Sequence, residues 1–125
     1  MSRIKPKGSK QEIFIRKTIF SLGYRYRLHR KDLPGTPDLA FPKYKKVIFI
    51  NGCFWHGHEG CKRAALPATN TEFWEKKISG NVERDKLNYK KLKELGWGYL
   101  TIWQCEIKKS TLEKLREKIS TFLKL

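Results

Sequence analysis

The first apolar pattern in the chain is helical. Ile15, Ile19 and Leu22 recur at the spacing that places side chains on one face of a helix. Residues 9–12, Ser-Lys-Gln-Glu, have the form of a capping box, and Gly23 follows the last apolar position. We therefore predict a helix between this capping box and Gly23.

Strand-like patterns follow in short segments separated by turns. Residues 24–29 alternate aromatic and basic side chains, as a half-buried strand does. Residues 38–41, which begin with Asp38, and residues 47–50 predict strands on either side of a short turn, and the preceding residues 32–37 are rich in turn-forming residues. Later in the chain, residues 97–103 are apolar and aromatic enough to predict a central strand.

Two further capping boxes, at residues 69–72 and 110–113, precede helical patterns. The first predicts a helix to about Ser79, where Gly80 breaks or bends the chain, and then a further helix to Leu95 closed by a glycine. The second predicts a final helix. One face of that helix carries the apolar residues Leu112, Leu115, Ile119 and Phe122.

The predicted order is α-β-β-β-loop-α-α-β-α, in which residues 51–70 form a loop without a clean period. This order predicts an α/β sandwich with a mixed central sheet flanked by helices. By analogy, it suits the restriction-endonuclease-like fold. Residues 1–8 are basic and predict an N-terminal arm, and residues 9–125 predict one domain.

The composition points to an ordered domain that binds a polyanion. Of 125 residues, 39% are hydrophobic and 13% aromatic, which is enough for a core and excludes a wholly disordered chain. Lysine and arginine number 28 against 12 aspartate and glutamate, a net charge of +16. Phosphate contacts supply most of the attraction of such a surface to DNA or RNA. A soluble basic surface without a ligand is the alternative.

Several sequence features predict a cytoplasmic location. No stretch approaches the roughly 18 apolar residues that span a membrane. The N-terminus also lacks the apolar run of a signal peptide. The three cysteines are an odd number, which suits a reducing compartment better than a disulfide framework.

The cysteines and one histidine have the spacing of a metal site. Cys53, His58 and Cys61 form C-x4-H-x2-C, and Cys105 follows the predicted strand at residues 97–103. Three thiolates and an imidazole are the ligands that structural Zn²⁺ prefers, and they would staple the long loop to a distant strand. His56 competes with His58 for the ligand role. The alternative is a buried Cys105 and free thiols.

A second group of residues has the chemistry of a phosphodiester-cleaving site. Asp38 follows a turn and opens a strand, where its carboxylate suits Mg²⁺. An imidazole such as that of His56 can take a proton from water near neutral pH. Glu12 shares a helical face with apolar residues, so its carboxylate points inward, where burial requires a partner. The alternatives are a turn or cap role for Asp38 and the capping box for Glu12.

One expected signature is missing. Many nucleases of this architecture follow Pro-Asp with Glu-x-Lys on the next strand, whereas that strand here ends Phe-Ile-Asn at residues 49–51. If the protein hydrolyses a phosphodiester, His56 must therefore replace the chemistry of that lysine.

Four motifs, in order and at matching spacing, resemble the very short patch repair (Vsr) DNA mismatch endonuclease family. They are LPGTPD at residues 33–38, NGCFWHGH at 51–58, TEFW at 71–74 and NVERD at 81–85. The resemblance runs from the start of the chain to the region of Cys105, and the block Gly-Cys-Phe-Trp-His is very specific. The final helix carries no signature of the family.

The resemblance implies a restriction-endonuclease-like fold with a structural zinc. It also implies Mg²⁺-dependent nicking of one strand on the 5′ side of the thymine in a T:G mismatch of double-stranded DNA. It assigns the magnesium to Asp38 and the backbone carbonyl of Ile50, the general base to His56, and a hold on metal-bound water to Glu12. It assigns the zinc to Cys53, His58, Cys61 and Cys105.

The same resemblance implies five residues that contact DNA. Phe54 and Trp55 would wedge into the duplex beside the mismatch, and Met1 would enter from the opposite groove. Lys77 and Asn81, four residues apart on one helix face, would read the T:G pair. Without the resemblance, an ordinary aromatic core and a solvated helix surface are the alternatives.

Two other functions remain open from the sequence. One is a less selective DNA endonuclease that shares the site but not the mismatch reading. The other is a zinc-stabilised, non-catalytic DNA-binding module, which the charge and the aromatic loop would also suit. We expect the protein to act as a monomer and not to bind a membrane.

Overall fold

The computed structural model describes residues 10–28, 30–58, 60–61 and 65–124. The predicted arm at residues 1–8, the DNA contact of Met1 and the capping residue Ser9 lie outside the described residues. The elements are α1 (Lys10–Ser21), β1 (Arg27–Leu28), β2 (Leu39–Phe41), β3 (Lys46–Asn51), α2 (Thr71–Glu94), β4 (Gly98–Trp103), the short 3-10 segments η2 (Gln104–Glu106) and η3 (Lys109–Thr111), and α3 (Leu112–Leu123).

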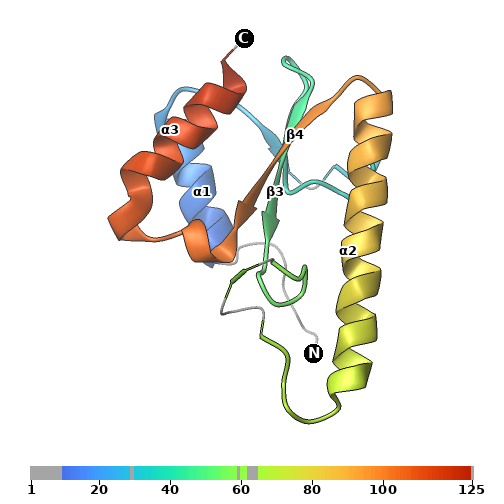
Figure 1. Cartoon of the computed structure of the whole chain (residues 1–125). Helices are drawn as coiled ribbons and strands as arrows, with labels where there is room; N and C mark the ends of the chain where they lie inside the picture. Colours follow the sequence, from blue (N-terminus) through green and yellow to red (C-terminus); the bar gives the residue numbers. More distant parts are fainter. Residues whose placement is uncertain (1–9, 29, 59, 62–64, 125) are drawn as a thin grey trace.

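The strands form one mixed sheet in the order β1-β2-β3-β4. The pairs β1–β2 and β2–β3 are antiparallel, whereas β3 and β4 are parallel. Figure 1 shows α1 and α3 together on one face of the sheet and α2 alone on the other. The predicted α/β sandwich with a mixed sheet is therefore confirmed.

Side chains along the strands point alternately to the two faces of the sheet, so the interior consists of two cores. Ile48 of β3 packs with α1 and α3, whereas its neighbours Val47 and Phe49 pack with Leu92 of α2. Successive side chains of a strand point to opposite faces, so one short apolar run serves two cores. The core on the side of α1 and α3 comprises Ile15, Ile19, Leu39, Phe41, Ile48, Ile102, Leu115, Ile119 and Leu123.

The structure corrects two predictions about the strands. β4 was predicted to be central, but it lies at an edge of the sheet that the described residues form. Its apolar character has another cause, because helices cover both of its faces. β1 is only two residues long, whereas residues 24–29 were predicted to be a strand; Tyr24 and Tyr26 instead pack against the core of α1 and α3.

The helix boundaries also differ from the prediction. α2 is one helix of 24 residues that continues through Gly80, where a break or bend was predicted. Gly80 is solvent exposed, and glycine costs a helix only about 1 kcal/mol, which a long packed helix tolerates. Asn70, in a left-handed conformation, precedes α2 without a side-chain cap, so the predicted capping box does not form.

The last helix begins differently as well. Thr111 is the residue before α3, and its side chain makes no cap. Its hydroxyl instead donates to the Glu106 carbonyl at 2.9 Å. The predicted capping box at residues 110–113 is therefore wrong, although the helix and its buried face are confirmed.

Candidate active site and metal cluster

Asp38 lies where the turn of residues 31–35 meets the sheet, directly before β2. The antiparallel register of β2 and β3 brings it beside the carboxyl end of β3. There the backbone N–H of Ile50 donates to the Asp38 carboxylate at 2.7 Å. This bond fixes the carboxylate next to the last residues of β3.

Asp38 and His56 line the same pocket, which has a volume of about 190 Å³. No lysine or arginine lines it among the described residues, so it is an acidic pocket in a protein of charge +16. The lining comes from the turn, β3, the loop and α2: Gly35, Thr36, Asp38, Phe49, Ile50, Asn51, His56, Asp85, Asn88 and Tyr89.

Asp85 of α2 orients the imidazole. Its carboxylate lies 2.7 Å from Nδ1 of His56. A carboxylate accepts, so Nδ1 carries the proton and Nε2 of neutral His56 is left with a lone pair. In the sequence, Asp85 is only the last residue of the motif NVERD and carries no sign of this role. The signal was weak because 29 residues separate the partners, and only packing of the loop on α2 brings them together.

Tyr89 and Asn51 form the back of the pocket. The Tyr89 hydroxyl lies 2.9 Å from the Thr101 hydroxyl. The Asn51 amide also donates to the Tyr89 hydroxyl, at 3.5 Å. Burial raises the pKa of Tyr89, while these two hydrogen bonds oppose the rise. Its phenol therefore stays neutral at physiological pH.

Glu12 is buried, as its place on the apolar face of α1 predicted. Its carboxylate accepts a hydrogen bond from Arg16, one helical turn further along. Glu12 is not among the described residues that line the pocket of Asp38 and His56. The residue before it, Gln11, lines a neighbouring pocket that reaches Ile50 and Asn51.

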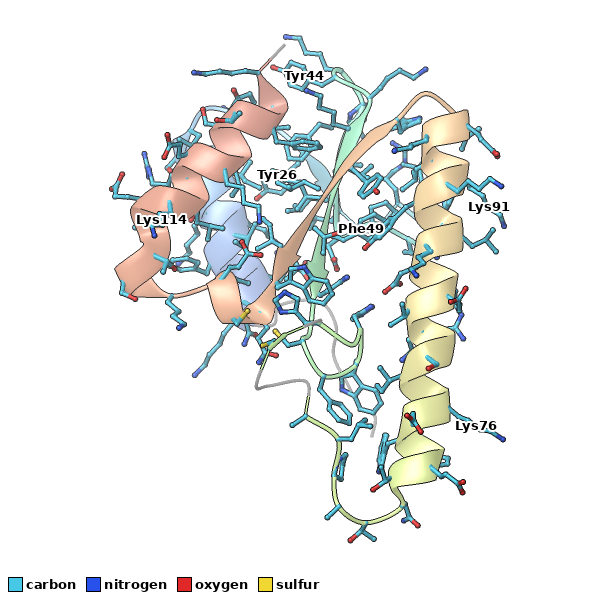
Figure 2. The ribbon with its side chains drawn as sticks, in the orientation of Figure 1. Tyr26, Tyr44, Phe49, Lys76, Lys91 and Lys114 are labelled. Atoms are coloured by element: carbon cyan, nitrogen blue, oxygen red, sulfur yellow. The ribbon has the colours of Figure 1, made fainter. Side chains whose placement is uncertain are left out.

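The four predicted zinc ligands come together. One ligand atom from each of Cys53, His58, Cys61 and Cys105 lies within 4.8 Å of all the others. Figure 2 shows the sulfur atoms gathered between the loop and the lower end of β4. Burial, and then the thiols of Cys53 and Cys61, raise the pKa of Cys105 to about 11. Such thiols become thiolates readily only beside a cation, so the set suits a soft divalent ion.

A tryptophan supports the histidine of this cluster. The Trp103 ring stacks on His58 with centroids 4.1 Å apart and planes 6° from parallel. Nδ1 of His58 lies 3.5 Å from Sγ of Cys105. His56 is directed elsewhere, toward Asp85, so the two histidines have different surroundings.

The aromatic residues of the loop form a half-exposed cluster with α2. Phe54, Trp55 and Trp74 contact one another edge to face, with centroids 5.3 to 5.7 Å apart. Phe73 extends the group at 5.1 Å from Trp74 and is 59% exposed, and Trp55 is 48% exposed. We call these four residues the aromatic cluster. Of these four residues, only Phe54 and Trp55 were predicted from the sequence to contact DNA.

Lys77 and Asn81 lie on α2 beside this cluster. Lys77 is exposed. The Asn81 amide donates to the Trp55 carbonyl at 2.8 Å, and its own oxygen accepts from Arg84 at 3.0 Å. Asn81 therefore holds the loop in place, and reading a base would require it to exchange these partners.

Among the described residues, no helix has the length and hydropathy needed to cross a membrane.

Together, an acidic pocket with an oriented imidazole and a Cys3His ligand set define an α/β protein that carries side chains suited to a metal ion and to hydrolysis. Known proteins identify the family. The family described as DNA mismatch endonuclease Vsr matches residues 1–63. The chain belongs to this family of DNA endonucleases.

Three relatives illustrate the similarity. The type II nicking enzyme V.XorIIP of Xanthomonas oryzae pv. oryzae is 42% identical over 98% of this chain and 88% of its own length. V.NmeAIP of Neisseria meningitidis serogroup A, also a type II nicking enzyme, is 40% identical over 99% and 86%. The DNA mismatch endonuclease Vsr of Escherichia coli K12 is 43% identical over 81% and 66%.

Proposed function

We propose that this protein is a Mg²⁺-dependent DNA mismatch endonuclease that nicks one strand on the 5′ side of the thymine of a T:G pair, in DNA repair. The observation that carries the proposal is the shared pocket of Asp38 and His56. Family membership and the relatives named as nicking or mismatch enzymes support it. The sheet and its helices also suit the restriction-endonuclease-like fold to which the sequence order was compared.

The donors of the pocket fit a hard divalent cation. Asp38 would hold Mg²⁺ with its carboxylate, and Ile50 with its backbone carbonyl at the end of β3. Few protein ligands suffice for Mg²⁺, which keeps several waters and binds phosphate oxygens. When bound, the ion would supply Lewis-acid stabilisation of the phosphate undergoing attack.

His56 is the proposed general base. The Asp85 carboxylate accepts a hydrogen bond from Nδ1–H of His56, so the Nε2 lone pair can take a proton from the attacking water. Asp85 also stabilises the imidazolium that forms, as a positioning residue. Glu12 is proposed to hold metal-bound water, which would require its carboxylate to reach from α1 beyond its contact with Arg16.

Zinc is the proposed occupant of the Cys3His cluster, held by Cys53, His58, Cys61 and Cys105. Its role is structural, because it would join the loop to the end of β4. His56 lies within that loop, between two of the ligands. The cluster would therefore keep the general base in place relative to Asp38.

Two residues of the aromatic cluster are proposed to enter the duplex at the mismatch. Phe54 and Trp55 would wedge between base pairs, which costs less at a weakly stacked T:G pair than in matched DNA. Lys77 and Asn81 would read the mismatched pair from α2, with Met1 in the opposite groove. We propose that the protein acts as a monomer in the cytoplasm.

A nicking assay tests the proposal. Duplexes that differ only in a T:G or T:A pair are incubated with the protein and Mg²⁺, and the product strands are separated. We expect one nick in the T:G duplex and no cleavage by Asp38→Ala. Equal cutting of both duplexes would instead establish a less selective endonuclease. Tight DNA binding without cleavage in any divalent metal would establish a non-catalytic module.

A further inference from the structure

A separate pocket lies at the other end of the sheet. Its volume is about 340 Å³, and residues 23–27 and 42–44 line it. β3 runs from Lys46, beside this pocket, to Asn51 in the acidic pocket, so the two sites lie at opposite ends of one strand. Figure 2 shows Tyr44 at the upper end of the sheet and the sulfur atoms near the lower end. We call this pocket the basic groove.

The charge of the basic groove has one sign. Arg25, Arg27 and Lys43 line it and are exposed, and no carboxylate lines it among the described residues. The chain has no aspartate or glutamate at all between residues 13 and 31 or between 39 and 58. The ion pairs seen among the described residues involve other cations. The three charges therefore remain available to an external anion.

Neutral rings hold two of these cations. The Arg25 guanidinium lies 4.5 Å above the ring of Phe20, and the Lys43 ammonium lies 5.8 Å from the ring of Tyr44. A ring restricts a cationic side chain without neutralising it, unlike a carboxylate. Such cations lose less conformational freedom when they bind an anion. This arrangement distinguishes the groove from an ordinary lysine-rich surface.

The rest of the lining comprises three tyrosines, Gly23 and Pro42. Tyr24, Tyr26 and Tyr44 are half-buried, and their rings contact one another or the core edge to face. They add hydroxyl groups and ring surface beside the cations. Phosphate-binding cations next to aromatic rings are the combination that binds single-stranded nucleic acid. The groove has the volume of a small-ligand pocket, and a double helix is too wide and convex to enter it.

We propose that the basic groove binds a single-stranded DNA segment, with phosphates on Arg25, Arg27 and Lys43 and a base against the tyrosine rings. The site is separate from the nicking pocket and does not depend on the proposed function. It would give the protein a second contact with DNA, at the end of the sheet remote from cleavage.

Binding of labelled oligothymidylate of about 20 nucleotides to the full chain, without added Mg²⁺, tests this site. The test variant is Arg25→Gln with Arg27→Gln and Lys43→Gln. The control is Lys90→Gln with Lys91→Gln and Lys93→Gln, which removes the same charge from exposed positions of α2. Because all six side chains are exposed, thermal unfolding should show both variants folded.

We expect the groove variant to bind the oligothymidylate about tenfold more weakly. The slope of log affinity against log salt concentration should also become shallower by about 2. The α2 control should lose less than about twofold. Nicking of a saturating mismatched duplex should be unchanged in the groove variant. Equal losses in both variants would show an effect of net charge alone and would overturn the proposal. An equal loss of affinity for a matched duplex would overturn the assignment to single-stranded DNA.

Discussion

The two ends of β3 differ in charge and in how that charge is held. At its carboxyl end, Asp38 and Asp85 line a pocket that no described cation enters. At its amino end, Arg25 and Lys43 lie over neutral rings, and no described carboxylate lines their groove. The local charge of a site, not the net charge of the protein, therefore indicates its ligand. A pair of acids in a basic protein calls for a cation, and unneutralised cations call for phosphate.

The largest expected effect comes from removing the acid at the carboxyl end. We expect Asp38→Asn to lower kcat for nicking by about 10³-fold or more, because the proposed metal would lose its carboxylate. Affinity for the mismatched duplex should not fall, since the change removes negative charge near phosphate. Strand separation gels and a binding titration measure the two quantities.

Asp32→Asn is the matched control for that variant. Asp32 lies on the preceding turn and is paired with Arg30, which lowers the pKa of Asp32 through a hydrogen bond. This exposed acid is outside the pocket, so its loss should leave kcat unchanged. A similar fall in both variants would mean that the turn, not the metal-binding carboxylate, sets the rate.

Loss of a ligand of the Cys3His cluster should impair the site at the carboxyl end of β3 more than the site at its amino end. We expect Cys105→Ser to reduce the bound zinc from about one per chain to a small fraction and to lower Tm by about 10 °C. Nicking should fall with the zinc content because the loop carries His56. Elemental analysis and thermal unfolding give the two values.

The amino end of β3 provides the internal control, because the tyrosines of the basic groove pack against the core and not against the loop. Oligothymidylate binding by Cys105→Ser should remain close to that of the unaltered protein at temperatures below its Tm. Full retention of zinc in this variant would contradict the proposed ligand set.

A smaller effect is expected from changing Asp85, the residue that positions the general base His56. We expect Asp85→Asn to lower kcat about 10²-fold, because the asparagine amide can donate to Nδ1 of His56 and favour the other tautomer, and because the imidazolium loses its negative partner. His56→Ala should cost more. The double variant should be no slower than His56→Ala alone, since Asp85 acts through the ring. Glu83→Gln, an exposed acid on the same helix, is the control.

The smallest effect concerns the approach of the loop to α2. Gly57 has φ +59°, and a Cβ there would lie 2.8 Å from Ile78 and 3.0 Å from Val82. We expect Gly57→Ala to lower the free energy of unfolding by about 1 to 3 kcal/mol, from backbone strain and crowding. Gly60→Ala has a positive φ but open space, so it separates strain from crowding in a denaturation experiment.

Local patterns predicted local features well. The spacing of Ile15 and Ile19 predicted α1 and its buried face, and Gly96 closes α2 with φ +85° as its position after Leu95 predicted. Gly80 and the two capping boxes misled the prediction. A glycine in a long helix and a capping sequence each change stability by only about 1 kcal/mol, so tertiary packing overrides them.

The sequence by itself determined which groups are present: the Cys3His spacing, the acid before a strand, the histidine among aromatics and the family to which they belong. Only the tertiary structure decided which of these groups meet. It joined His56 to Asp85 across 29 residues, left Glu12 outside the pocket lining, and assembled a groove from cations that no motif marked. The reason is physical, because burial of two apolar faces of one sheet sets these distances, and no residue encodes them alone.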